Sequence, residues 1–275
     1  MMGPSHAMSA AAVWLSGTIA YTAVTGTTMP LPVVIMSTAI CAGAALWPDL
    51  DQHNSTVIKS FGIFGKGAYE LVNWLSLLTY DATKTKYDEK EKTNGHRTLM
   101  HTTPMAILTG ILVSLGAMMA GTAEIMGKTF TNGQIFSLVT MWIFMHLAIG
   151  GLFESQMRQT RKKYGPYVML AGSAVLTLIT ATMLPAGETY GWLGIAVGAG
   201  MLIHCLGDLI TKMGTPSVWP FKIRGKRWYD VALPSFMRIT TGGGVEKVLL
   251  SGFTIVTAGC LAYYMLNLSG TVPGI

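Results

Sequence analysis

The sequence predicts an all-α integral membrane protein with about seven transmembrane helices, an interfacial helix and a polar site on the cytoplasmic side. Apolar residues make up 51% of the 275-residue chain, and charged residues make up 12%, about half the fraction usual in a soluble domain. The mean hydropathy is +0.46, and the apolar residues form blocks of about bilayer-spanning length. We therefore treat residues 1–275 as a single transmembrane domain.

Seven apolar blocks are long enough to cross a bilayer core, which takes about 17 to 25 helical residues. They lie at residues 7–25, 31–48, 104–121, 134–154, 166–184, 191–209 and 246–267. The linkers at 26–30 and 185–190 are short and rich in turn-forming residues, so each joins antiparallel neighbours. No Lys or Arg precedes the first block, which is unlike a cleaved signal peptide, and we expect this block to be retained.

The segment 61–80 is apolar but interrupted. Lys66, Glu70 and Asn73 lie in its middle, together with three glycines. Polar groups at membrane depth are costly, so an interfacial or re-entrant helix fits this pattern better than an eighth span.

The basic residues are divided unequally between the two sides of the membrane. Seven spans place the N-terminus and residues 49–103, 155–165 and 210–245 on one side. Of the 19 Lys and Arg residues, 18 fall on that side, counting Lys247 at the mouth of the last span, and only Lys128 falls on the other. The positive-inside rule makes the first side cytoplasmic, which predicts an inner (cytoplasmic) membrane protein. Because topology explains the net charge of +6, we expect membrane lipid as a partner and no nucleic acid; the oligomeric state is left open.

Residues with metal-binding chemistry collect at the cytoplasmic ends of the spans. His204 and Asp208 are four residues apart, so they share one helical face. Asp49 and Asp51 would face the same way in an extended chain, where a cation would relieve their repulsion. Imidazole and carboxylate groups suit zinc, manganese and iron. The candidate ligands are His6, Asp49, Asp51, His53, His96, His101, His204 and Asp208.

Each cluster also has a structural interpretation. His6 alone is an ordinary terminal residue, and His204 with Asp208 is an interfacial hydrogen-bonded pair. His146 lies within a span with no carboxylate near it, which indicates a packed histidine. The basic run 158–163 is typical of a headgroup anchor, and 222–230 of a headgroup contact or a phosphate clamp. The gathering of several clusters on one membrane face favours a metal site over these readings.

Four blocks follow one another along most of the chain: His6, WPDLDQHNS (47–55), GHRTLMHT (95–102) and HCLGDLITKMGTPSVWP (204–220). A late segment, GGGVE, ends at Glu246. In this order they resemble the YdjM-like inner-membrane proteins, a family of membrane-bound metal-dependent hydrolases. Three positions depart from the family pattern: Gln52 separates His53 from the second aspartate, Thr98 replaces a glycine, and Thr102 replaces a serine.

The resemblance implies a membrane-embedded metal-dependent hydrolase. We expect one or two divalent ions, zinc or manganese, and cleavage of a phosphoester of a lipid or lipid-linked substrate by metal-activated water. Arg97 is expected to bind phosphate, with Lys212 as a second candidate. Asp51 or Glu246 is the expected general base. Three hydroxyl residues are expected beside the ligands: Ser55, Thr102 and Thr211.

Two other classes of function fit the same residues. A non-catalytic protein would bind a metal ion or a lipid headgroup without turnover, or would transport an ion. The span interiors carry few polar residues, which disfavours an ion path. A structural membrane protein with a vestigial site is the third possibility. Metal binding without turnover on any substrate would favour these alternatives.

Overall fold

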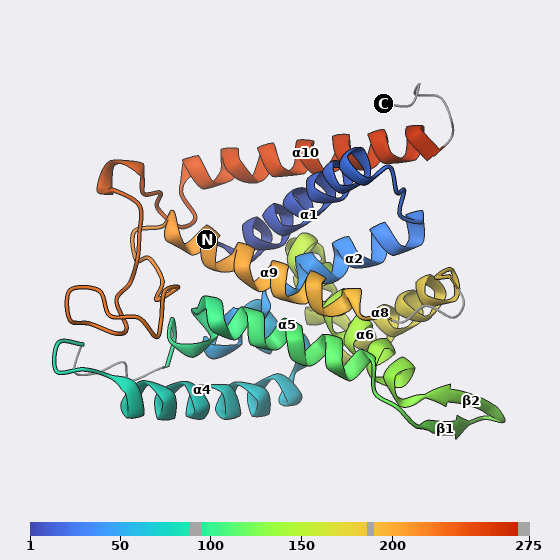
Figure 1. Cartoon of the computed structure of the whole chain (residues 1–275), viewed down its shortest axis with the longest axis horizontal. Helices are drawn as coiled ribbons and strands as arrows, with labels where there is room; N and C mark the ends of the chain where they lie inside the picture. The colour runs from blue at the N-terminus through green and yellow to red at the C-terminus, as the bar shows by residue number, and fades with distance from the viewer. Residues whose placement is uncertain (89–94, 186–189, 269–275) are drawn as a thin grey trace.

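The computed structural model describes residues 1–88, 95–185 and 190–268 and is mostly helical (Figure 1). The α-helices are α1 (Gly3–Thr25), α2 (Leu31–Ala44), α3 (Thr56–Phe61), α4 (Ile63–Thr83), α5 (Thr103–Ala117), α6 (Asn132–Leu152), α7 (Glu154–Tyr164), α8 (Pro166–Thr182), α9 (Trp192–Leu209) and α10 (Gly244–Leu268). Three short 3-10 helices are η1 (Trp47–Asp51), η2 (Leu99–His101) and η3 (Ser235–Met237), and one hairpin pairs β1 (Thr122–Ile125) with β2 (Lys128–Thr131).

Five helices of the described part of the chain are long and apolar enough to cross a membrane: α1, α2 continued through η1, α6, α9 and α10. The apolar helices α5 and α8 are shorter. The predicted helical membrane fold is confirmed, whereas the count of seven spans stays a prediction. In Figure 1 the starts of α1, α5 and α10 lie at the same end of the molecule as the end of α9.

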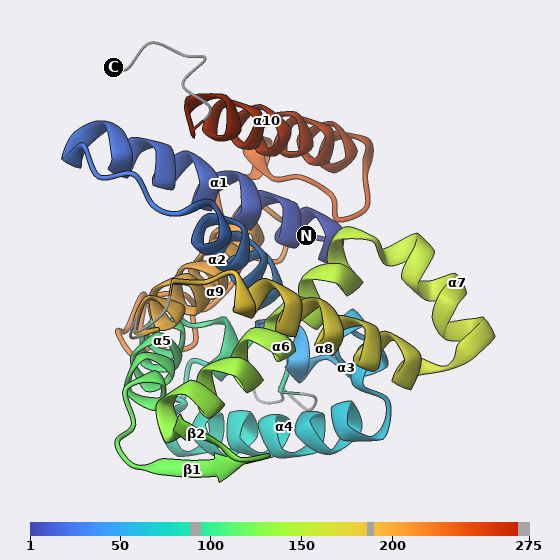
Figure 2. The same cartoon turned by 90° about the vertical axis from the view of Figure 1, so that its right-hand side faces the viewer.

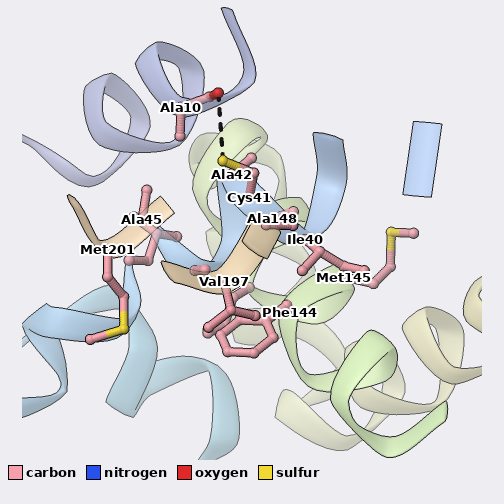
Figure 3. Close-up of a cluster of buried hydrophobic side chains, with 14 of the residues drawn as sticks. Ala10, Ile40, Cys41, Ala42, Ala45, Phe144, Met145, Ala148, Val197 and Met201 are labelled. Atoms are coloured by element: carbon pink, nitrogen blue, oxygen red, sulfur yellow. Dashed lines mark hydrogen bonds between the residues drawn. The ribbon is translucent and has the colours of Figure 1, made fainter. Parts of the chain in front are cut away.

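Helix α2 lies in the middle of the bundle, between α1, α6 and α9. Its residues Ile40 and Cys41 are fully buried, and the Cys41 thiol donates to the Ala10 carbonyl of α1 at 3.8 Å (Figure 3). On α9, Gly200 lies directly against the Cys41 carbonyl, where a Cβ would collide with it. Small residues at such crossings let membrane helices pack closely without large apolar side chains. This packing fixes the ends of α2 and α9 relative to each other.

Helices α5 and α9 make the most extensive helix pair. Gly110 of α5 faces Gly194 and Gly198 of α9, so the two backbones are in direct contact. The Ser114 hydroxyl donates to the Gly191 carbonyl at 2.8 Å. Because the chain just before α5 and the end of α9 each carry two of the predicted ligands, this contact also positions the site.

Helix α4 runs along one edge of the molecule (Figure 1) and is absent from the five membrane-spanning candidates among the described helices. Gly65, Ser76 and Tyr80 are buried, and the opposite face exposes large apolar residues such as Leu71 and Trp74. An amphipathic helix of this kind suits a membrane interface. The interfacial or re-entrant placement of 61–80 stays a prediction.

The segments between the apolar helices contain structure that the sequence analysis did not predict. The hairpin β1–β2 occupies the predicted loop 122–133, and the polar helix α7 occupies the predicted loop 155–165. The long segment 210–243 is tied to the chain just after α4 through Asp88, which accepts the Trp228 backbone N–H at 2.9 Å. Backbone donors lower the pKa of Asp88, although its burial opposes this shift.

Candidate metal centre

Four segments far apart in the sequence meet at one end of the helix bundle. They are the first turn of α1, the η1 helix after α2, the η2 helix before α5, and the last turn of α9. They bring together seven of the eight predicted ligands: His6, Asp49, Asp51, His96, His101, His204 and Asp208. The antiparallel order of the helices explains this meeting, because their polar ends fall on the same side.

Two imidazole nitrogens and two carboxylate oxygens alternate around the centre. Asp49 Oδ1 lies 3.8 Å from both His101 Nε2 and His204 Nε2. Asp208 Oδ2 lies 3.8 Å from His101 Nε2 and 3.7 Å from His204 Nε2. These separations are too long for hydrogen bonds. Donors that bind one zinc ion tetrahedrally at about 2.0–2.2 Å are about 3.3–3.6 Å apart, so a closure of a few tenths of an ångström would produce that spacing.

The two imidazole nitrogens at the centre are buried and lack partners. His101 and His204 are both 0% exposed, and the Nε2 atom of each has no hydrogen bond within the described structure. An unsatisfied buried polar atom costs about 1–3 kcal/mol, so such an atom calls for an explanation. A cation bound between Nε2 and the two carboxylates would supply the missing partner. The donor set therefore fits a divalent metal ion.

The outer nitrogens of these histidines are held in place. The Nδ1–H of His204 donates to the Ala45 carbonyl at 2.7 Å, which leaves a lone pair on Nε2. Asp51 contacts two histidines, with Oδ1 2.8 Å from Nδ1 of His96 and Oδ2 3.2 Å from Nδ1 of His101. A carboxylate behind a histidine ligand orients the ring and makes it a stronger donor. The position of Asp51 is that of such an orienting residue.

A second group of possible ligands lies around Asp208. The ring of His6 stacks on the ring of His204 with centroids 3.8 Å apart, and His6 Nε2 lies 3.4 Å from Asp208 Oδ1. The Met1 ammonium donates to the same oxygen at 2.7 Å. Two sets of three residues have ligand atoms within 4.8 Å of one another: His6 with His204 and Asp208, and Asp49 with His96 and His101. The arrangement thus has donors for one ion or for two.

The centre favours positive charge. Burial alone would lower the pKa of His101, but the surrounding carboxylates, that of Asp51 first, raise it to about 10. Without a metal ion, His101 therefore holds a proton near neutral pH. A divalent cation would take the place of that proton, because metal binding displaces protons from its ligands.

Arg97 connects the centre to the loop after α9. Its Nη2 atom lies 3.1 Å from Asp208 Oδ2, and Nη1 donates to the Gly214 carbonyl at 2.5 Å. The backbone of Arg97 has a φ of 55°, in the left-handed region that residues with a Cβ seldom adopt. These contacts hold an uncommon conformation and place the guanidinium beside Asp208, on the wall of a cavity.

Three predicted site residues lie elsewhere. His53 is exposed, with its ring 5.4 Å from that of Tyr69, and belongs to neither set of possible ligands. Gln52, inserted before His53, separates it from η1. Glu246 accepts the backbone N–H groups of Met2 at 2.6 Å and Gly242 at 2.7 Å, which is a capping role. Lys212 is exposed and is not among the residues that line the cavity.

The predicted hydroxyl residues support the backbone around the centre. Thr102 and Ser55 are the N-caps of α5 and α3, and Thr211 donates to the Asp208 carbonyl at 2.8 Å. Thr215, which the sequence analysis missed, donates to the His101 carbonyl at 2.8 Å. The Ala45 carbonyl was also missed, because no side-chain pattern reveals a backbone acceptor.

A cavity of about 480 Å³ opens from the centre. Asp49, His96, Arg97 and Asp208 line it. Asp49 is 19% exposed and Asp51 is fully buried, so Asp49 is the more accessible of the two carboxylates. The cavity gives a ligand access to the centre.

Comparison with known proteins gives one match. The model of the family described as YdjM inner membrane protein matches residues 1–153 and 167–271, which is nearly the whole chain. The match includes every segment of the metal centre. Neither the curated proteins nor the solved structures give a match.

Proposed function

The chain belongs to the YdjM family of inner membrane proteins, and on that premise we propose that it is a membrane-embedded metal-dependent hydrolase. Its substrate in this proposal is a phosphoester of a lipid or of a lipid-linked molecule. The cofactor is one or two divalent ions, zinc or manganese by the chemistry of the donors.

One observation carries the proposal. Two fully buried histidines, each with one nitrogen fixed by the protein and the other without a partner, point to the same pair of carboxylates at the end of a cavity. A purely structural histidine uses both nitrogens. His146 is such a case, because its ring nitrogens contact the Ser173 hydroxyl at 3.1 Å and the Ser60 carbonyl at 3.2 Å.

The protein's contribution to hydrolysis is to orient donors and to hold charge. A bound divalent ion lowers the pKa of water and so supplies hydroxide near neutral pH. Asp51 keeps His96 and His101 in the ligating orientation, and Arg97 holds Asp208. The predicted bases Asp51 and Glu246 both accept hydrogen bonds through both carboxylate oxygens. Asp49 is better placed to contact a ligand in the cavity.

The location of the centre supports a lipid substrate. The centre lies where α1, α2 and α9, three of the membrane-spanning candidates in the described chain, have their polar ends. A phosphoester at headgroup depth could reach it with little displacement from the bilayer. We place this end of the molecule in the cytoplasm, because 18 of the 19 Lys and Arg residues were assigned to that side.

The second candidate function is metal or headgroup binding without turnover. The same donors would bind the ion, and the cavity would hold the headgroup. Transport has less support, because His146 on α6, away from the centre, is occupied by structural hydrogen bonds.

The decisive experiment measures bound metal in the detergent-purified protein. We expect one or two divalent ions per chain, loss of metal in His101→Ala and in His204→Ala, and retention in the matched control His53→Ala. Unchanged metal in both centre variants would refute the site. Hydrolysis of phospholipids and of a generic phosphodiester, with and without chelator, then separates the two functions, since bound metal without turnover leaves only the binding protein.

A further inference from the structure

The cavity that opens from the metal centre has a basic outer wall. Asp208 and Asp49 lie at its inner end, since they are only 2% and 19% exposed, whereas Lys59 and Arg158 are exposed. Farther out, α3 contributes Lys59, and α7 contributes Arg158 and Arg161. Segments that are about a hundred residues apart thus bring three cations to one cavity wall.

The fold places the four basic residues of the run 158–163 of α7 in two different environments. Arg158 and Arg161 are three residues apart, share one helical face and line the cavity. Lys162 and Lys163 are exposed and are not among its lining residues. Lys163 lies 4.9 Å from the centre of the Tyr164 ring. A headgroup anchor would need no such division, so the two arginines call for a separate explanation.

The outer wall carries a surplus of positive charge. Glu154 of α7 is the one carboxylate beside Lys59, Arg158 and Arg161 on this wall, as far as the described lining residues go. Three cations and one anion give a formal charge of +2 there. None of the three cations forms an ion pair within the described ranges 1–88, 95–185 and 190–268. The wall is therefore suited to bind an anion.

A second cavity of about 410 Å³ adjoins this wall. It is lined by Pro4 of α1, Leu152 of α6, and Glu154, Ser155 and Arg158, two of which also line the first cavity. Figure 2 shows the start of α1 beside the junction of α6 and α7. Both α1 and α6 are membrane-spanning candidates, so a ligand in this cavity could keep its apolar part in the lipid.

We infer that Lys59, Arg158 and Arg161 bind the phosphate of an anionic membrane amphiphile that enters through the second cavity, beside the start of α1 and the end of α6. The planar guanidinium groups suit bidentate binding of phosphate oxygens, and Pro4 and Leu152 in the lining of the second cavity suit an apolar tail. The inference rests on the proposed function, because it names the class of substrate for the same centre. Binding itself requires no turnover.

The test compares two double variants with the same change in charge. Full-length protein in neutral detergent is titrated with a short-chain phosphatidic acid, and binding is measured by calorimetry. Arg158→Gln/Arg161→Gln should bind roughly tenfold or more weakly, because each basic residue near an anionic headgroup contributes about a factor of five. Lys162→Gln/Lys163→Gln should stay within about twofold of the unchanged protein. Lys59→Gln should show an intermediate loss.

Three results would overturn the inference. Equal weakening in the two double variants would show unspecific attraction to surface charge, and unchanged binding in both would show that the arginines are not involved. Inorganic phosphate that binds as tightly as the short-chain lipid, or a zwitterionic short-chain lipid that does so, would exclude an anionic amphiphile.

The metal measurement separates this inference from the proposed function. If Arg158→Gln/Arg161→Gln keeps its metal and its turnover with an unchanged KM, the inferred binding of the substrate phosphate by these arginines is contradicted. The proposed hydrolase activity is then retained. If no variant turns over any substrate but the selective loss of lipid binding is seen, the inferred phosphate site is supported and the proposed hydrolase activity is contradicted. Thermal unfolding of each variant identifies any that are misfolded, and Lys59→Gln then provides the independent readout.

Discussion

Asp49 and Asp51 differ in role although they are two residues apart. In an extended chain both side chains would point to the same side, which was the expectation from the sequence. The chain instead forms the 3-10 helix η1, where successive residues are about a third of a turn apart, so the two side chains diverge. Asp49 faces the Nε2 atoms of His101 and His204, and Asp51 faces Nδ1 of His96 and His101.

Asp51→Asn tests this division of roles. An amide offers one acceptor oxygen, so it can orient one of the two histidines but not both. We expect the affinity for the metal ion to fall about 10- to 100-fold, as for other residues that orient ligands. Asp49→Asn changes a donor at the centre, so its affinity for the metal ion should fall further.

The measurement for both variants is competition with a chelator of known affinity. Losses of equal size in Asp49→Asn and Asp51→Asn would indicate that Asp51 also binds the ion directly, as the sequence analysis predicted. No loss in Asp51→Asn would show that the orientation of His96 and His101 does not depend on it.

At the scale of elements, close helix contacts hold the ligands in place. Gly200 lies one turn before His204 on α9 and against the end of α2. In Gly200→Ala the new methyl group would overlap the Cys41 carbonyl and lie 2.8 Å from the Ala44 Cβ. We expect the helices to separate and the free energy of unfolding to fall by about 1–3 kcal/mol, the usual cost of overpacking.

The matched control for that variant is Gly172→Ala on α8, where a Cβ would meet nothing within 4 Å. It should be neutral or slightly stabilising, because alanine restricts the unfolded chain more than glycine does. Thermal unfolding in detergent measures both. A stable Gly200→Ala variant with its metal intact would mean that this contact does not position the centre.

The elements that could be predicted from the sequence were those with a strong apolar pattern. The spans 7–25 and 191–209 correspond to α1 and α9. The predicted span 104–121 ends early, at Ala117, because the chain turns there toward the hairpin. Helix α7 was missed because it buries no residue and so shows no apolar stripe.

At the scale of the whole molecule, the gathering of His and Asp side chains that could hold a metal ion was predictable by residue type, and the cavity was not. Histidines and aspartates are rare at membrane depth, so their order along the chain pointed to one site. The basic wall depends on which face of α7 lines the cavity opposite or beside α3, and this depends on how segments about a hundred residues apart are placed. No local pattern distinguishes Arg158 and Arg161 from Lys162 and Lys163.

The orientation in the membrane is a prediction for the whole molecule. Lys128 lies in the hairpin at one end of the molecule in Figure 1, and the long segment 210–243 lies at the other. Lys162 is exposed on α7, beside the cavity of the metal centre. The unequal distribution of basic residues places the hairpin outside the cytoplasm and α7 within it.

Single cysteines at these two lysines decide the orientation. Cys41 and Cys205 are buried, so a Cys260→Ser background should label weakly. In cells with a permeabilised outer envelope and an intact inner membrane, a membrane-impermeant maleimide should label Lys128→Cys at once. It should label Lys162→Cys only after the inner membrane is opened. The reverse order would put the metal centre on the outer face, and a soluble cytoplasmic substrate would then be excluded. Labelling of both positions from one side would contradict the assignment of the hairpin and α7 to opposite faces of the membrane.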